Sequence, residues 1–199
     1  MTGRDLDTLG FYASEAATYA ARDRRLDDLR LQRFVGVLPA GGQVLELGCG
    51  GGQDSAALLA LGLDLTATDG SPELAAQAQQ RLGRPVSVLL FEDLAAEAAY
   101  DGVWANACLL HVPRPALPGI IAKVHRALRP GGVFYASFKA GEAEGRDRFG
   151  RYYNYPSPGW LRQAYGAGRW AKLEIEEAAG SGYDREPTLW LHAVAFKIA

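Results

Sequence analysis

A run of glycines lies between an apolar strand pattern and a helical pattern near residue 50. The sequence passes from Val44 to Leu47, through Gly48-Cys49-Gly50-Gly51-Gly52-Gln53, to a helical pattern from Asp54 to Leu61. Glycine has no Cβ atom, so a ligand can approach the backbone of such a turn closely. The N–H groups at the start of the following helix face an anionic or polar group lying in the turn. These residues predict a cofactor that carries a ribose or a carboxylate.

The spacing of the glycines separates the ligand classes that use such a turn. A phosphate-binding P-loop needs a lysine after its last glycine, and none follows here. The dinucleotide pattern Gly-x-Gly-x-x-Gly would use Gly48 and Gly50, but Gln53 stands where the third glycine should allow close helix packing. The pattern therefore excludes a P-loop and disfavours a dinucleotide.

Asp69 is the second candidate for chemistry. It follows the apolar strand pattern of residues 63–68 and stands about twenty residues beyond the glycine turn, where an acid accepts hydrogen bonds from ribose hydroxyls. The alternative is that Asp69 caps the helix that opens at Ser71-Pro72-Glu73, since aspartate and serine are both good caps. We favour the ribose role for Asp69, with Ser71 as the cap.

His111 is the one group near this region that titrates around neutral pH, so it is a candidate to accept a proton from a substrate. A hydrogen-bonded structural histidine is the commoner case, and catalysis is the second interpretation. His111, His125 and His192 have no paired spacing that would hold zinc, so no metal is expected. Cys49 and Cys108 are predicted to be small buried residues rather than a disulfide.

The elements that must position these residues alternate between short strands and helices, which indicates an α/β fold with a parallel sheet. The last two strands are separated only by residues 179–187, so they can pair as an antiparallel hairpin. The expected strands are 44–47, 63–68, 86–91, 101–107, 133–138, 173–177 and 189–198, and the expected helices are 54–61, 72–82, a helix bearing Leu117 to Leu128, and 157–166, with a short helix at 94–99.

The whole chain has 199 residues, which suits one well-buried domain. Its net charge of -2 does not suggest a nucleic-acid partner, because phosphate neutralisation needs clustered Lys and Arg. The polar start and the lack of a long apolar run predict a cytoplasmic protein without a membrane span. We expect a monomer or homodimer with a small-molecule substrate.

The segment Glu46-Leu47-Gly48-Cys49-Gly50-Gly51-Gly52 resembles the first motif of class I S-adenosylmethionine (SAM)-dependent methyltransferases, and the resemblance covers most of residues 8–140. It implies a Rossmann-like doubly wound sheet, mostly parallel with one reversed strand, in the order 3-2-1-4-5-7-6. It also implies SAM as the cofactor, residues 1–40 as a helical lid and residues 41–199 as the core.

The resemblance carries the cofactor site onto particular residues. The glycine turn lies against the methionine part, an acid at the end of the second strand meets the ribose, and the segment after the third strand borders the adenine. Asn106 would meet the cofactor through its backbone, while Tyr12 and Tyr19 would cover the methionine end and Arg22 would pair with the carboxylate. Alternatives are a solvated Arg22, core tyrosines, and Asp93 as a helix cap. The implied set is Tyr12, Tyr19, Arg22, Gly48, Cys49, Gly50, Gly52, Asp69, Gly70, Ser71, Glu92, Asp93, Leu94 and Asn106.

The acceptor is expected at the loop from Lys139 to Tyr155, because loops at the carboxyl ends of parallel strands border the ligand crevice. The alternative is a solvated surface loop. The candidate substrate residues are His111, Lys139, Arg146, Arg151, Tyr152 and Tyr153. The implied reaction is in-line methyl transfer, in which alignment can contribute roughly 7–11 kcal/mol and makes a dedicated base optional. An NAD-dependent oxidoreductase and a non-catalytic SAM-binding module remain the competing hypotheses.

Overall fold

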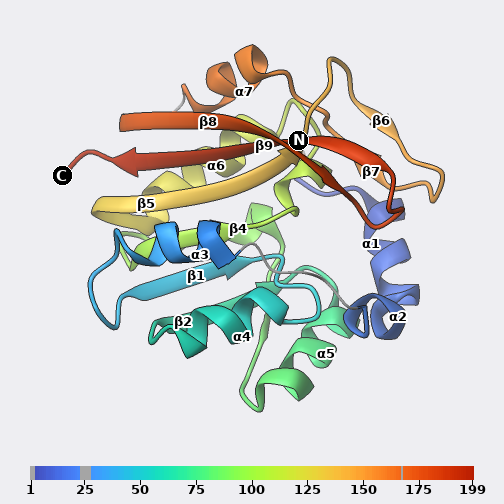
Figure 1. The fold of residues 1–199 in the computed structure, drawn as a ribbon, viewed down its shortest axis with the longest axis horizontal. Helices are drawn as coiled ribbons and strands as arrows, with labels where there is room; N and C mark the ends of the chain where they lie inside the picture. Colours follow the sequence, from blue (N-terminus) through green and yellow to red (C-terminus); the bar gives the residue numbers. More distant parts are fainter. Residues whose placement is uncertain (1–2, 23–27, 167) are drawn as a thin grey trace.

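The computed structural model describes residues 3–22, 28–166 and 168–199 (Figure 1). Three helices come first, and strands and helices then alternate. The helices are α1 (Leu6–Ser14), α2 (Ala16–Ala20), α3 (Asp28–Val35), α4 (Gln53–Ala60), α5 (Pro72–Leu82), α6 (Leu117–Ala127) and α7 (Pro158–Tyr165). The strands are β1 (Gln43–Leu47), β2 (Asp64–Asp69), β3 (Ser87–Val88), β4 (Tyr100–Ala105), β5 (Leu128–Lys139), β6 (Gly145–Arg146), β7 (Tyr152–Tyr153), β8 (Trp170–Ser181) and β9 (Pro187–Lys197), with short 3-10 helices η1 (Phe91–Asp93) and η2 (Leu109–His111).

Seven of the strands form one sheet, in the order β3-β2-β1-β4-β5-β9-β8. Neighbours from β3 to β5 are parallel, whereas β9 is antiparallel to both β5 and β8. The sheet is therefore mixed, and its parallel part carries the glycine turn. β6 and β7 make a separate two-stranded ribbon. The expected α/β class with a mostly parallel sheet is confirmed.

Helices cover both faces of the sheet. Leu31 and Phe34 of α3 and Leu58 of α4 belong to one buried cluster, while α6 and α7 belong to the other. Burial of a large aliphatic side chain contributes about 1.5–3 kcal/mol, so the apolar face of α6 is a large stabilising element.

α1 and α2 lie beside each other at one end of the sheet, near β6 and β7 (Figure 1). α3, by contrast, packs on the core. Of the expected helical lid, only α1 and α2 therefore lie at the end of the sheet near β6 and β7. Residues 23–27 of the expected lid lie outside the described residues.

Local chemistry explains where α5 begins and ends. The Ser71 hydroxyl accepts a hydrogen bond from the Leu74 N–H at 3.2 Å, and Pro72 occupies the first turn. Gly83 ends the helix with φ of 63°, a left-handed conformation that glycine adopts readily. The predicted range 72–82 is confirmed, as is the role of Ser71 as the cap.

Several predicted elements differ from the structure. The helix expected at 94–99 does not form, because the N–H groups of Ala98 and Ala99 bind the carbonyls of Arg126 and Ala127 at the end of α6 instead. The third strand is shorter than expected and covers only Ser87–Val88. In the described part of the chain, no helix has the length and apolar character that crossing a membrane requires.

Candidate functional site

The glycine turn connects β1 to α4 and has a left-handed backbone. Gly48 has φ of 64° and Gly50 has φ of 57°. A Cβ atom at Gly48 would collide with the Cβ of Cys108 on the neighbouring connection, and one at Gly50 would stand 3.1 Å from the Cε1 of Tyr19. The turn therefore needs glycine for the close approach of the protein's own elements as well as for a ligand.

Asp69 lies at the end of β2 with its carboxylate folded toward the glycine turn. One oxygen accepts the Gly50 N–H and the other accepts the Ser71 N–H, both at 2.8 Å. The side chain is buried, and burial raises the pKa of Asp69 to about 6, although the backbone hydrogen bonds oppose the shift. Because Ser71 caps α5, Asp69 organises the turn rather than the helix.

A cavity of about 80 Å³ adjoins Asp69 and the glycine turn. Its walls are apolar on the side of β3 and polar or aromatic on the side of α1 and α2. They include Gly48, Gly50, Asp69, Gly70, Leu74, Leu89, Leu90, Phe91, Tyr12, Tyr19 and His111. A smaller polar cavity of about 30 Å³ continues along the turn past Cys49, Gly51, Asp54 and Asn106 to Arg22.

The segment after β3 meets this cavity through different residues from those expected. Leu89, Leu90 and Phe91 line it, whereas Glu92, Asp93 and Leu94 do not. Glu92 accepts the Gly3 N–H and lies 3.2 Å from the Arg4 guanidinium, Asp93 is exposed in η1, and Leu94 is buried in the core. The segment that lines the cavity thus comes directly before the expected residues, because β3 ends already at Val88.

α2 is anchored directly on the glycine turn. The Ala20 carbonyl accepts hydrogen bonds from Gln53 at 3.2 Å and from Arg81 at 2.8 Å, and Arg81 also donates to the Gly51 carbonyl. Gln53, which replaces the third glycine of the dinucleotide pattern, thus binds the end of α2. Gly52 comes close to Ala78 of α5.

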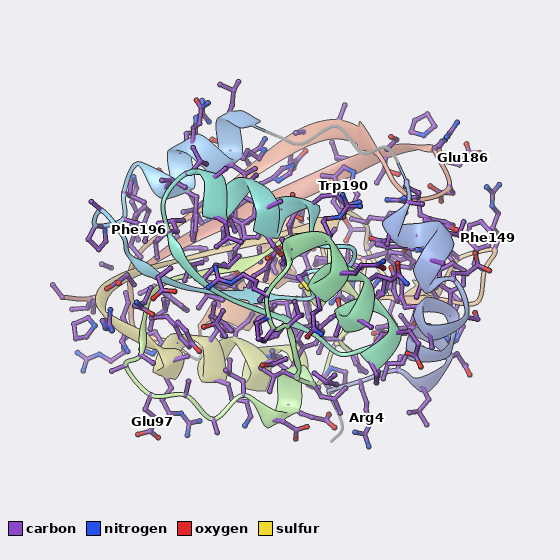
Figure 2. The ribbon with its side chains drawn as sticks, turned by 90° about the horizontal axis from the view of Figure 1, so that it is seen from below. Arg4, Glu97, Phe149, Glu186, Trp190 and Phe196 are labelled. Carbon is purple, nitrogen blue, oxygen red and sulfur yellow. The ribbon has the colours of Figure 1, made fainter. Side chains whose placement is uncertain are left out.

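Arg151 joins α1 to the loop after β5. Its guanidinium is buried, donates twice to Asp147 at 2.6 and 2.9 Å, and donates to the Tyr12 hydroxyl at 3.2 Å. Five aromatic rings surround it at 4.8–5.7 Å from their centroids: Phe11, Tyr12, Phe149, Tyr153 and Tyr183. These rings come from α1, the loop, β7 and the β8–β9 turn. Figure 2 places Phe149 and Glu186, which belong to the loop and the turn, at the end of the molecule opposite Phe196.

The hydrogen bonds of His111 fix its protonation. Its Nδ1 lies 2.6 Å from the Tyr152 carbonyl, which can only accept, so Nδ1 carries the proton. Its Nε2 therefore accepts from the Tyr12 hydroxyl at 2.9 Å. Burial lowers the pKa of His111 to about 3, so the ring is neutral and a weak base. This arrangement supports the structural interpretation of His111 over the catalytic one.

We expect His111 to make folding pH-dependent. Because its pKa is lower in the folded chain than in the unfolded chain, only the unfolded chain gains its proton as the pH falls below about 6.5. The wild type should therefore lose at most about 2 kcal/mol more stability than His111→Gln between about pH 7 and pH 5. Denaturant unfolding at the two pH values measures this, and equal losses in the two proteins would refute it.

A much larger cavity, about 660 Å³, lies next to the first one. It is bounded by α1, α2, the ends of β4 and β5, β7 and the β8–β9 hairpin. The two cavities share Tyr12, Tyr19, Ala107 and His111, and all three cavities share Tyr19 and Ala107. The large cavity is lined also by Arg22, Asn106, Leu110, Ser137, Lys139, Arg151, Tyr153, residues 178–183, Arg185, Trp190 and His192.

A polar network holds the backbone where the cavities meet. Asp54 accepts from Asn106 at 2.8 Å, Ser137 donates to the Asn106 side-chain oxygen at 2.6 Å, and the Ala107 N–H donates to Ser137 at 2.8 Å. Ala107 has φ of 53°, a left-handed conformation that costs a residue with a Cβ atom about 1–3 kcal/mol and is common at functional sites. The side chain of Asn106 is occupied by this network, which leaves its backbone for a ligand.

The other expected site residues divide between the cavity and the surface. Lys139, Arg151, Tyr153 and His111 line the large cavity. Tyr152 donates to Glu144 outside it, and its N–H binds Thr8 of α1. Arg146 is exposed and pairs with Asp5 at 2.7 Å. Arg146 and Tyr152 therefore fasten α1 to the loop, and neither of them lines the large cavity.

Arg22 lines both the large cavity and the polar cavity along the glycine turn. Its guanidinium lies 4.5 Å from the centroid of Tyr19 and 4.7 Å from that of Tyr183. Within the described residues it forms no ion pair with a carboxylate. This position supports the expectation that Arg22 faces a ligand rather than solvent.

Sequence reasoning did not identify Asp54, Ala107, Ser137, Tyr183, Arg185 or Trp190 as part of the site. Ser137 and Trp190 lie in strands that were predicted, but their contacts depend on strand pairing. The turn Gly182-Tyr183-Asp184-Arg185 was seen only as a connection, although its mixture of aromatic and charged residues could have indicated a ligand-facing loop.

Residues 44–132, from β1 to the start of β5, match a protein family described as "Methyltransferase domain". The match covers less than half of the chain, and that part is similar to a methyltransferase domain. Proteins of this kind use SAM as their cofactor. The matched part contains the glycine turn, Asp69, the apolar wall after β3, Ala107 and His111.

The curated relatives that this chain matches are also named as methyltransferases. A ubiquinone biosynthesis O-methyltransferase of Xanthomonas axonopodis pv. citri is 40% identical over 120 residues, which cover 56% of this chain and 49% of the relative. The chain thus spans about half the length of the relatives that it matches.

Two solved structures show the same fold along nearly the whole chain. The Burkholderia thailandensis 1,6-didemethyltoxoflavin-N1-methyltransferase, solved with S-adenosylhomocysteine (SAH), matches with a TM-score of 0.72 and 24% identity over 98% of this chain and 88% of its own. The N-methyltransferase NodS of Bradyrhizobium japonicum, also bound to SAH, matches with a TM-score of 0.66 and 18% identity over 93% and 97%.

Proposed function

We propose that the protein transfers a methyl group from SAM to a small-molecule acceptor. The observation that carries this proposal is the meeting of two cavities at Tyr12, Tyr19, Ala107 and His111. One cavity has the glycine turn and acid of a nucleoside site, and the other has room for a second small molecule. Methyl transfer between two bound molecules needs two sites that share a wall.

The described residues fit the cofactor. Gly48 and Gly50 expose backbone in a left-handed turn, and Asp69 presents a buried carboxylate beside it. We propose that Asp69 accepts hydrogen bonds from the ribose and that Leu89, Leu90 and Phe91 cover the adenine. Arg22 is proposed to pair with the carboxylate of the methionine part, and the backbone at Asn106 to bind its polar groups. We also propose that the described elements form one domain, with residues 41–199 as the core.

When bound, the cofactor supplies a methyl group on an activated sulfonium. The protein's part is to align the acceptor and exclude water. α2 lies on the glycine turn, and Arg151 fastens α1 to the loop and the β8–β9 turn. Such a closed wall keeps water and other nucleophiles from the reacting atoms. His111 and Tyr12 bind each other, so their proposed role is to shape the wall.

Ligand-dependent melting tests the proposal. SAM and SAH should each stabilise the protein, whereas NAD should not, because Gln53 and α2 occupy the position that a dinucleotide needs. A ligand at about a hundred times its Kd contributes about 2.7 kcal/mol, or about 5–10 °C in a chain of this size. Stabilisation by NAD and by neither sulfur compound would instead support the oxidoreductase.

A further inference from the structure

The large cavity has cationic and aromatic walls. Its charged lining side chains are Arg22, Lys139, Arg151 and Arg185, and its lining rings include Tyr12, Tyr19, Tyr153, Tyr183 and Trp190. Of the described residues, no aspartate or glutamate lines it. A planar ring can stack on such walls, and cationic groups attract an anion.

Apart from Arg22, which is proposed to pair with the cofactor, two of these cations are poorly neutralised by the protein. Lys139 is buried, yet its ammonium lies 3.7 Å from the Asp184 carboxylate. This distance is longer than that of a charge-assisted hydrogen bond, which is about 2.7–2.9 Å. Arg185 is exposed in the β8–β9 turn and forms no ion pair with a described residue. Arg151, by contrast, is held by Asp147 at 2.6 Å. Lys139 and Arg185 are therefore the side chains most available to a ligand.

The surroundings of Lys139 favour an arriving negative charge. Burial lowers the pKa of Lys139, Arg151 lowers it further, and Asp184 and Asp147 raise it. Its ammonium also lies 4.7 Å from the centroid of Tyr153. An anion in the cavity would compensate the charge that burial destabilises.

Three titratable side chains that line the cavity, His111, Tyr12 and Tyr153, are poor bases near neutral pH. The acceptor nitrogen of His111 receives the Tyr12 proton, and Nδ1 of His192 lies 2.8 Å from the Tyr135 hydroxyl. Burial raises the pKa of Tyr12 and of Tyr153, so neither becomes a phenolate base. A nucleophile that is already ionised needs none of these three groups as a base.

We propose that the acceptor is a planar aromatic acid that binds as its anion, with its negative charge facing Lys139 and Arg185. This inference rests on the proposed function and adds the class of substrate. The lone pair of the ionised oxygen or nitrogen forms the bond to the methyl carbon, and the carbon–sulfur bond of SAM breaks with its electrons going to sulfur. No proton passes to the protein in that step.

The dye para-nitrophenol tests this, because only its anion absorbs strongly in the visible. It is titrated with acid in the presence of excess SAH-loaded protein. We expect the ionisation midpoint to fall by about one pH unit, which corresponds to tenfold tighter binding of the anion. Benzoate should displace the dye, whereas the uncharged benzamide should not.

Charge variants locate the effect. Lys139→Gln and Arg185→Gln should each reduce the shift, and Arg185, being exposed, can be replaced without loss of folding. Lys172→Gln and Arg33→Gln are the matched controls, because both cations are exposed outside the cavity, and they should keep the shift. The proposal is overturned if the dye does not bind, if it binds without a shift, or if both cavity variants keep the full shift of the wild type. Calorimetry with SAH on the same samples separates the two kinds of failure. If SAH binds but the dye test fails, only this inference is wrong. If SAH does not bind, the proposed function is wrong as well.

Discussion

Gly50→Val should abolish SAM and SAH binding while leaving the protein folded. A side chain at this position begins with a Cβ atom 3.1 Å from Tyr19, and the branches of valine add atoms in the turn against which the cofactor is proposed to lie. We expect the affinity to fall by about a hundredfold or more, which is about 2.8 kcal/mol. Isothermal titration calorimetry with SAH measures the change.

Gly62→Val is the matched control for backbone strain. Gly62 also has a left-handed backbone, with φ of 84°, but a Cβ atom there would meet nothing within 4 Å. Both variants should therefore lose stability, since a left-handed residue with a Cβ atom costs about 1–2 kcal/mol. Only Gly50→Val should lose SAH. Equal SAH affinity in the two variants would show that the cofactor does not lie against the turn.

Asp69→Ala is expected to have the second-largest effect. The variant removes an acceptor of charge-assisted hydrogen bonds, each contributing about 1.5–3 kcal/mol, so SAH affinity should fall about tenfold to a hundredfold. Ser157→Ala controls for lost stability, because Ser157 caps α7 away from the cavities and should keep SAH affinity. Unchanged affinity in the Asp69 variant would exclude the ribose role.

The same carboxylate should make SAH binding pH-dependent. Burial raises the pKa of Asp69 to about 6, so the carboxyl is largely protonated at lower pH, and only the ionised form accepts from two hydroxyls. Affinity should fall about tenfold from about pH 7 to about pH 5. Asp69→Asn cannot titrate and should show a flat profile over that range. The stability of the folded protein changes with pH in the opposite direction. An acid whose pKa is raised by folding stabilises the folded state at low pH, and this contribution is lost as the pH rises through about 6.

Much of the fold could be predicted because its signals are local. The range of α5 follows from Ser71, Pro72 and Gly83, which mark the start and the end of the helix in the sequence itself. Asp69 could be identified as a candidate because an acidic residue at the end of the strand that follows a glycine turn is typical of a ribose-binding acid. The expected helix at 94–99 failed because a distant partner, the end of α6, takes its backbone hydrogen bonds.

The second cavity could be predicted only in part. Lys139 and Arg151 were identified because they lie at the end of β5 and in the loop that follows it, which the fold brings to the site. Arg146 and Arg151 have the same charge and similar neighbours, yet one is bound by Asp5 on the surface and the other is enclosed by five rings. That difference depends on where α1 packs, which no local pattern specifies. Tyr183 and Arg185 reach the cavity through the β8–β9 hairpin, whose length exceeds the predicted strands.

Methyl transfer itself is the most direct test of the central claim. The protein is incubated with SAM labelled in its methyl group and a panel of aromatic metabolites, and both SAH and labelled small molecules are measured by chromatography. The account predicts that wild type and Gly62→Val form SAH and one labelled product in equal amounts, and that Gly50→Val forms neither. If wild type binds SAM but forms SAH no faster than buffer alone with every acceptor, the chain is a SAM-binding module and the proposed activity is contradicted.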